Sequence, residues 1–249
     1  MVYFLSDLHL GAKYFENPRE KELAVVRFLD SIAADAEEVY LLGDVLDYWY
    51  EYRTVVPRGY VRFFAALARL TDAGVKVTWM TGNHDVWLFD YLRTEIGIRV
   101  LKGYQEVEIK GTRFLLSHGD DVGQQPWTYR ALLSLFHNRL CQRLYASVHP
   151  RITYAIAHGW SHKSRTSHSR QQKVKASVAQ CYGNLVDFAR AYGAEHPAVK
   201  HFVMGHLHMA KQETIDEAGR TLTILGDWIS KNTYATFDGS EIMLHTFKA

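Results

Sequence analysis

The sequence predicts an α/β protein made of two packed β-sheets with helices outside them. Over the first 85 residues, short apolar runs alternate with amphipathic stretches in the order strand, helix, strand, helix, strand. That order is typical of parallel strands with helices packed on a sheet. A hairpin-like pair and a series of short strands follow in the second half, and these predict a second sheet.

The composition indicates one compact domain. The chain has 249 residues, of which 47% are hydrophobic, and it contains only five prolines. A chain of this length can bury one large core, and no stretch has the composition of a linker. We therefore expect a single domain over residues 1–249.

The first half is expected to contain three strands and two helices. Each strand is a short apolar run that ends at a polar or glycine-containing turn, and each helix carries apolar residues at helical spacing among charges. The expected strands are residues 2–5, 39–42 and 75–81, and the expected helices are residues 19–34 and 60–70.

The second half is expected to supply the other sheet and two long helices. The first two strands read as a hairpin because Lys110-Gly111-Thr112 separates them. The expected strands are residues 105–109, 113–117, 201–204, 212–215, 222–225, 234–237 and 242–247, and the expected helices are residues 127–145 and 168–192.

Residues 120–198 differ from the rest of the chain in charge and are expected to form a helical insertion within the domain. They contain ten lysines and arginines against four aspartates and glutamates, a net charge of +6. Because the whole chain carries only +2, the remainder carries −4. A basic helical segment therefore accompanies an acidic body.

No targeting or membrane-spanning segment is expected. The apolar start, residues 1–5, reaches Asp7 too soon for the core of a signal peptide. No stretch approaches the ~18 uninterrupted apolar residues of a spanning helix. Cys141 and Cys181 lie far apart without metal-binding spacing, so we interpret them as reduced thiols of a cytosolic protein.

Five strand ends carry side chains that can bind a metal ion. Four of the five have a glycine next to the side chain or one residue away. Carboxylate, amide and imidazole groups without thiolates suit Mn²⁺, Fe²⁺ or Zn²⁺, and there are too many groups for one ion. Two ions that share a bridging carboxylate would use them all. The groups in chain order are Asp7 and His9, Asp44, Asn83 and His84, His118, and His206 and His208.

These residues resemble the signature of the calcineurin-like metallophosphoesterases. The blocks Asp-x-His, Gly-Asp, Gly-Asn-His-Asp, a single histidine and Gly-His-x-His all occur in order from Asp7 to His208. The resemblance implies a four-layer α-β-β-α sandwich of two mixed sheets flanked by helices, with the helical insertion as a lid. It also implies two divalent metal ions, with Mn²⁺ favoured over Fe²⁺ and Zn²⁺.

The resemblance implies a role for each residue of the signature. His84 would be the catalytic histidine, steadied by Asp85. The first metal would be bound by Asp7, His9, Asp44 and His208, and the second by Asp44, Asn83, His118 and His206.

The expected chemistry is hydrolysis of a phosphoester or phosphoanhydride. Two neighbouring ions can hold a bridging hydroxide that attacks phosphorus in line, while they stabilise charge on a phosphoryl oxygen. His84 would stabilise that charge or protonate the leaving group.

Within the family, the chain most resembles the UDP-2,3-diacylglucosamine diphosphatases, enzymes of bacterial lipid A biosynthesis. The similarity lies in the chain length, the opening residues 6–11 and the helical insertion before Gly-His-x-His. It implies cleavage of UDP-2,3-diacylglucosamine to UMP and diacylglucosamine 1-phosphate.

A nucleotide-linked glycolipid needs both apolar and basic contacts. The residues expected to line an acyl groove are Trp127, Leu132, Leu133, Leu135, Phe136, Leu140 and Leu144. The residues expected to contact the substrate's phosphates are Arg165, Arg170, Lys173 and Lys175, together with Asn83, His84 and His206 of the signature.

Other functions stay open at this point. A phosphodiesterase or pyrophosphatase of soluble nucleotides would need no apolar groove. A nuclease would use the basic insertion, but the sequence has no aromatic and basic platform for bases, so no nucleic acid is expected. A scaffold without catalysis would have lost metal ligands, and none is lost. We expect a cytoplasmic protein, and the lipid substrate leaves open a peripheral contact of the insertion with the inner membrane.

Overall fold

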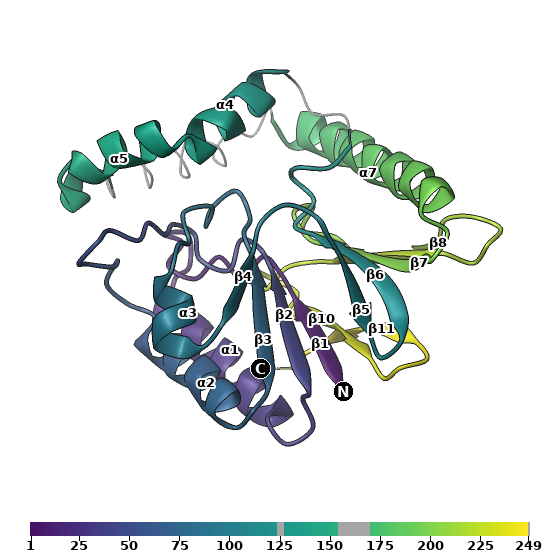
Figure 1. Ribbon diagram of the computed structural model, residues 1–249, viewed down its shortest axis with the longest axis horizontal. Helices are drawn as coiled ribbons and strands as arrows, with labels where there is room; N and C mark the ends of the chain where they lie inside the picture. The colour runs from purple at the N-terminus through teal and green to yellow at the C-terminus, as the bar shows by residue number, and fades with distance from the viewer. Residues whose placement is uncertain (124–126, 154–169, 249) are drawn as a thin grey trace.

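The computed structural model describes residues 1–123, 127–153 and 170–248, without the side chains of residues 170–177. Two β-sheets pack face to face, and helices cover their outer faces (Figure 1). The expected fold class, an α/β sandwich of two mixed sheets flanked by helices, is therefore confirmed.

The first sheet has six strands in the order β11-β10-β1-β2-β3-β4. Its parallel part pairs β1, β2, β3 and β4, while β10 pairs antiparallel with β1 and β11 pairs antiparallel with β10. The parallel strands therefore all end at one edge. The bounds are β1 Val2–Leu5, β2 Glu38–Leu42, β3 Lys76–Met80, β4 Arg99–Leu101, β10 Thr233–Phe237 and β11 Ile242–Thr246.

The second sheet has five strands in the order β5-β6-β7-β9-β8. Strands β6, β7 and β9 are parallel, and β5 and β8 are antiparallel at the two edges. The expected hairpin is present between β5 and β6, with Lys110 and Gly111 both at positive φ, the conformation of a tight two-residue turn. The bounds are β5 Gln105–Ile109, β6 Thr112–Ser117, β7 Val199–Met204, β8 Ala210–Thr214 and β9 Thr221–Leu225.

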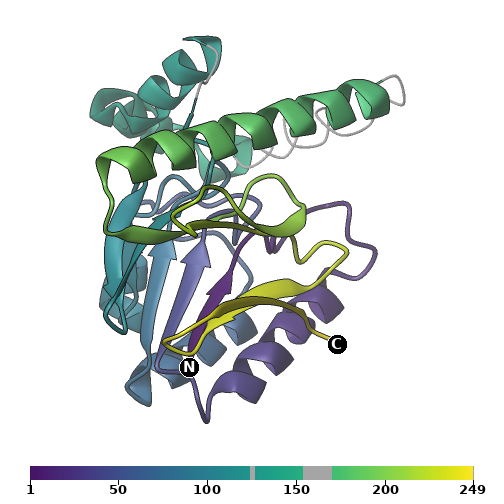
Figure 2. The same ribbon diagram turned by 90° about the vertical axis from the view of Figure 1, so that its right-hand side faces the viewer.

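Alternating side chains along β1 show how the layers are held together. Val2 and Phe4 lie in the core between the two sheets, whereas Tyr3 and Leu5 lie in the core beneath the helices. That outer core includes residues of α1 (Pro18–Ile32), α2 (Val61–Asp72) and α3 (Tyr91–Ile96). A third core joins sheet two to α7 (Arg170–Glu195), which lies across that sheet in Figure 2. The result is four layers, helix on sheet on sheet on helix.

A buried carboxylate joins the first two helices. Helix α2 begins after Tyr60, whose side chain caps no backbone N–H. Instead, Glu22 of α1 accepts hydrogen bonds from the backbone N–H groups of Arg62 (3.0 Å) and Phe63 (3.2 Å). Glu22 also pairs with Arg19 at 2.6 Å. Glu22 therefore satisfies the first N–H groups of a neighbouring helix.

The insertion begins with two short helices rather than the single helix expected over residues 127–145. Helix α4 spans Trp127–His137 and α5 spans Arg139–Ser147. The expectation was wrong at Asn138, whose backbone is extended and whose side chain accepts from the N–H groups of Leu140 and Cys141. An asparagine that caps a new helix ends the previous one. The short elements α3 and β4 were not expected either.

Tyrosine and tryptophan side chains attach α4 and α5 to the body of the protein. Tyr50 donates its hydroxyl to the carbonyl oxygen of Gln142 (2.6 Å), and Trp87 donates its indole N–H to that of Phe136 (3.0 Å). The rings of Trp87 and Tyr145 lie 4.7 Å apart. Both helices lie above the edge at which the parallel strands of sheet one end (Figure 1). In the described part of the chain, no helix combines the length and apolarity needed to span a membrane.

Candidate metal centre

The five strand ends singled out in the sequence meet at one place. Strands β1, β2 and β3 of sheet one and β6 and β7 of sheet two each run into one of the expected blocks. Three sets of side chains have potential ligand atoms that all lie within 4.8 Å of one another: Asp7, His9 and His208; His9, Asp44 and His84; and Asp44, His118 and His206.

Asp44 belongs to two of these sets. Its Oδ2 atom is 3.4 Å from Nε2 of His118 and 3.6 Å from Nε2 of His9. Its Oδ1 atom accepts a hydrogen bond from the backbone N–H of His84 (2.9 Å). A single carboxylate therefore faces histidines from both sheets.

Asp7 holds a similar position on the other side of His9. Its Oδ1 atom is 3.5 Å from Nε2 of His208 and 3.8 Å from Nε2 of His9. Its Oδ2 atom accepts from the backbone N–H of His206 (2.9 Å). This bond fixes the end of β7 in sheet two against the end of β1 in sheet one.

The backbone at these positions has an uncommon conformation. Eight described non-glycine residues have positive φ, and five of them are expected ligands: Asp7 (54°), His9 (45°), Asp44 (52°), His206 (68°) and His208 (53°). Residues with side chains rarely adopt this region, and such strain gathers at functional sites. The strain therefore supports a functional role for this cluster.

The glycines beside the expected ligands allow close approach. A Cβ atom at Gly43 would lie 2.5 Å from Nδ1 of His118, and one at Gly205 would lie 2.6 Å from Oδ2 of Asp7. Any larger residue would push these side chains apart. The glycine that accompanies a strand-end ligand in the sequence therefore makes room for a ligand from another strand.

Several buried polar atoms of the cluster have no hydrogen-bond partner among the described residues, although such atoms are nearly always satisfied. They include Oδ1 of Asp7, Nε2 of His9, Oδ1 of Asn83 and Nε2 of His118. The orientation of the His118 ring is set by its other nitrogen. Nδ1 lies 2.8 Å from the carbonyl oxygen of Leu42 and therefore carries the hydrogen. Nε2 is then the nitrogen that can bind a cation. The residues present therefore fit divalent ions.

The titration of the cluster also fits a cation site. Burial raises the pKa of the Asp44 carboxyl, but His118 and His84 beside it hold that pKa well below its usual range. Burial and the neighbouring His118 lower the pKa of His206, and burial lowers the pKa of His208 to about 4. Although burial opposes it, Asp44 raises the pKa of His118 well above its usual value, and Asp47 and Asp7 raise the pKa of His9 to about 9. The buried carboxylates thus attract positive charge to the cluster, and a bound cation would displace the protons of these two imidazoles.

Asp85, which we expected to steady His84, bonds to the backbone and to an indole rather than to the imidazole. The carboxylate of Asp85 accepts from the backbone N–H groups of Gly82 (2.7 Å) and Val45 (2.9 Å) and from the indole of Trp79 (3.1 Å). Both of its oxygens are thereby used, and they tie the turn after β2 to the turn after β3. Asp85 supports the loops of the cluster rather than the imidazole.

Asp47 takes the place that was expected for Asp85. Nδ1 of His84 lies 2.9 Å from the carbonyl oxygen of Asp47 and 3.6 Å from its Oδ1. The same Oδ1 lies 3.4 Å from Nδ1 of His9. Sequence reasoning missed this residue, although an acid three residues after Asp44 was a visible signal.

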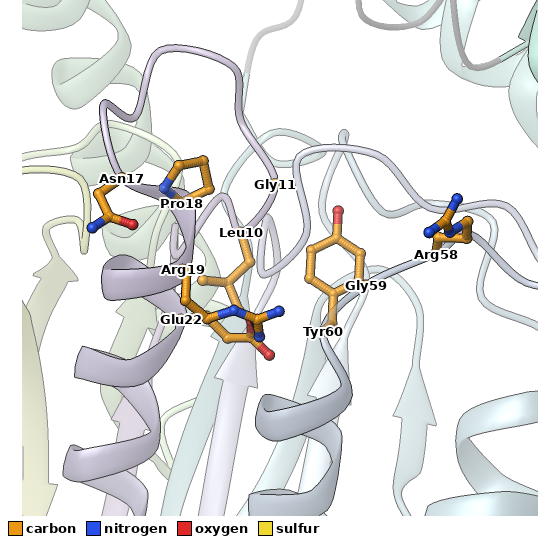
Figure 3. Close-up of a pocket in the computed structure, with 9 residues that line it drawn as sticks. All are labelled: Leu10, Gly11, Asn17, Pro18, Arg19, Glu22, Arg58, Gly59 and Tyr60. Atoms are coloured by element: carbon orange, nitrogen blue, oxygen red, sulfur yellow. The ribbon is translucent and has the colours of Figure 1, made fainter.

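A cavity of about 400 Å³ lies between the starts of α1 and α2 (Figure 3). Two arginines, Arg19 and Arg58, are among its lining residues. The remaining lining residues are Leu10, Gly11, Asn17, Pro18, Glu22, Gly59 and Tyr60. Gly11 follows His9 by two residues, and a Cβ atom there would lie 2.0 Å from the hydroxyl oxygen of Tyr60.

The expected substrate contacts outside the signature are only partly described. Arg165 lies outside the described residues, and the side chains of Arg170, Lys173 and Lys175 are not described either. None of the seven residues expected to form an acyl groove is buried: Trp127, Leu135, Leu140 and Leu144 are exposed, and Leu132, Leu133 and Phe136 are half-buried.

Comparison with known proteins places the chain in one family. The model of the calcineurin-like phosphoesterases matches residues 1–210. The chain is 39% identical to a protein of Porphyromonas gingivalis named UDP-2,3-diacylglucosamine hydrolase, over 99% of this chain and 97% of that one. Proteins with the same name from Neisseria meningitidis serogroup C (94% and 92% covered) and Haemophilus ducreyi (91% of each covered) are each 29% identical. The chain therefore belongs to the calcineurin-like phosphoesterase family, and it is a metal-dependent hydrolase.

Proposed function

We propose that this protein cleaves the phosphoanhydride of UDP-2,3-diacylglucosamine, giving UMP and diacylglucosamine 1-phosphate, at a centre of two divalent ions. The observation that carries the two-ion centre is the position of Asp44. Its Oδ2 atom faces His9 at 3.6 Å and His118 at 3.4 Å, so one carboxylate serves both sets of ligands. The substrate follows from the relatives, which bear this substrate in their names over nearly the whole length of the chain.

The ligand sets of the proposal are those that the signature implies. Asp44 would belong to both sets. Ions held there would supply Lewis-acid charge that stabilises phosphoryl oxygens and acidifies water. Mn²⁺ is the ion that we propose. One set is Asp7, His9, Asp44 and His208, and the other is Asp44, Asn83, His118 and His206.

His84 is the proposed proton donor. Its Nδ1 hydrogen is donated to the carbonyl of Asp47 (2.9 Å), which leaves Nε2 directed toward the cluster, 3.9 Å from Oδ2 of Asp44. The side chain is 20% exposed, so it can reach a substrate above the cluster. In its protonated form, Nε2–H would donate to a phosphoryl oxygen or to the leaving oxygen.

Helices α4 and α5 are the proposed contact with the lipid. Trp127, Leu135, Leu140 and Leu144 are between 52% and 78% exposed, an unusual number of large apolar side chains for two short helices. Arg130, Arg139 and Arg143 on the same helices are also exposed. An amphipathic, basic surface of this kind suits acyl chains and an anionic membrane surface.

The test compares three substrates with Mn²⁺ present: UDP-2,3-diacylglucosamine, UDP-N-acetylglucosamine and a chromogenic phosphodiester. We expect UMP from the diacyl substrate at a much higher kcat/KM than from the unacylated one. Equal turnover of both, or of neither, would contradict the lipid substrate.

Asp44→Asn should abolish all turnover and lower the metal content, and an active Asp44→Asn variant would contradict the two-ion centre. Asp30→Asn, an exposed acid paired with Arg69, is the matched control.

A further inference from the structure

The loop after β9 lies beside the metal centre, although the sequence signature does not include it. Strand β9 pairs in parallel with β7, and Ile224 lies opposite Met204. Both strands therefore leave sheet two at the same edge. There β7 continues into His206 and His208, and β9 continues into Asp227.

Asp227 holds this loop in one conformation. Its side chain is buried, and its Oδ1 atom accepts from the backbone N–H of Ser230 (2.7 Å), the hydroxyl of Ser230 (3.2 Å) and the backbone N–H of Lys231 (3.4 Å). Thr233 closes the loop, because its backbone N–H donates to the carbonyl of Asp227 (3.2 Å). A loop satisfied internally in this way can hold its outward groups in place.

Two groups of the loop reach the backbone of the metal centre. The N–H of Trp228 donates to the carbonyl oxygen of Asp7 (3.0 Å). The ammonium of Lys231 donates to the carbonyl oxygen of His208 (2.6 Å) and lies 3.7 Å from Oδ2 of Asp227. Lys231 thus lies beside the buried carboxylate of Asp227 and contacts the backbone of His208, a candidate metal ligand.

The contacted carbonyls belong to strained residues. Asp7 has φ of 54° and His208 has φ of 53°. Rotation about φ moves a residue's own carbonyl group, so a hydrogen bond to that carbonyl resists relaxation toward negative φ. Relaxation of His208 would also swing its imidazole, whose Nε2 lies 3.5 Å from Oδ1 of Asp7. The strain must be held by the surroundings.

We propose that Lys231, oriented by Asp227, is a positioning residue that holds His208 in the geometry needed to bind a metal ion. Lys231 acts on the backbone of His208 and is not itself a ligand. The inference rests on the proposed function, because it takes His208 to be a metal ligand.

The test is calorimetric titration of metal-free protein with Mn²⁺. Lys231→Met should retain two binding events, with one of them about tenfold weaker, the cost typical of losing a residue that orients a ligand. Lys211→Met is the matched control: its side chain is 40% exposed against 44% for Lys231, and it pairs with Glu213 rather than with the centre. Asp227→Asn should weaken the same event as Lys231→Met.

The outcomes separate the inference from the proposed function. Lys231→Met that binds both ions as the wild type does, or that weakens both events and lowers the unfolding temperature of the metal-free protein, would overturn the positioning role. A wild-type protein that binds no second ion, or a His208→Gln variant that binds as the wild type does, would overturn the ligand role of His208 instead.

Discussion

The backbone carbonyl oxygen of Asp47 lies 2.9 Å from Nδ1 of His84. A carbonyl can only accept, so this contact determines which nitrogen of His84 carries the hydrogen and leaves Nε2 facing the cluster. Oδ1 of Asp47 is close to the same ring and to His9 as well, at 3.6 Å and 3.4 Å. Asp47 therefore links the proposed proton donor to a proposed metal ligand.

Replacing Asp47 by Asn tests this link. The backbone contact to His84 should survive, but the negative charge beside both imidazoles is lost, so we expect kcat to fall about 10- to 100-fold. Steady-state kinetics with the diacyl substrate measure the effect. Asp30→Asn removes an exposed carboxylate of the same size and should leave kcat unchanged. An Asp47→Asn variant with wild-type kcat would refute the link.

Replacing His84 separates proton donation from metal binding. His84→Gln should keep both ions and lower kcat by roughly 10²- to 10⁴-fold, because only the acid is removed. His118→Gln should lose one ion, since its buried Nε2 faces Asp44 at 3.4 Å. Mass spectrometry of desalted protein gives the metal content. The assignment of roles would be reversed if His84→Gln lost an ion while His118→Gln retained both.

Replacing Glu22 tests the contact between α1 and α2. Glu22→Ala removes the acceptor of two backbone N–H groups and the partner of Arg19, so we expect the free energy of unfolding to fall by about 2 kcal/mol. Urea denaturation measures the change. Glu20→Ala on the same helix removes an exposed ion pair with Arg27 and should cost less than ~0.5 kcal/mol. Equal losses for the two variants would contradict the capping role.

His201 predicts a pH dependence of stability that does not involve the metal centre. Burial, with a further contribution from Lys200, lowers the pKa of His201 from 6.5 to about 4. As the pH falls, His201 therefore takes up a proton in the unfolded chain before it does so in the folded protein. The contribution of neutral His201 to the free energy of unfolding is complete above pH 6.5 and is lost as the pH falls toward 4.

The matched comparison is wild type against His201→Gln. The difference between their unfolding free energies should change by on the order of 1–3 kcal/mol between pH 7 and pH 4, measured by urea denaturation. A difference that is constant with pH would show that His201 titrates normally in the folded protein.

The apolar surface of α4 and α5 predicts binding to anionic vesicles. Changing Trp127, Leu135, Leu140 and Leu144 together to Ser should weaken co-sedimentation with phosphatidylglycerol vesicles at least about tenfold, because burial of each side chain contributes on the order of 1–3 kcal/mol. Val61→Ser on α2, where Val61 is 72% exposed, is the control and should bind as the wild type does. Equal vesicle binding by the two variants would contradict a membrane contact through these helices.

Much of the fold and the candidate site could be predicted because the informative features are local. The apolar run of β2 followed by Gly43 and Asp44 is visible in six consecutive residues, and the same holds at the ends of β1, β3, β6 and β7. The boundary between α4 and α5 at Asn138 was missed because the helical pattern of apolar residues continues through it. The side chain of Asn138 caps α5 and thereby competes with a continuous helix.

The sequence by itself determined the types of side chains in the cluster, their order and the strand ends that carry them. Only the tertiary structure decided which of them touch. Asp85 is adjacent to His84 in the chain but turns toward the N–H groups of Gly82 and Val45, so Asp47, from another strand end, meets the imidazole. Lys231 reaches the carbonyl of His208 from 23 residues away. The positive φ angles at the proposed ligands likewise appear only in the folded structure. These features depend on distance in space, which neither strand pattern nor residue type encodes.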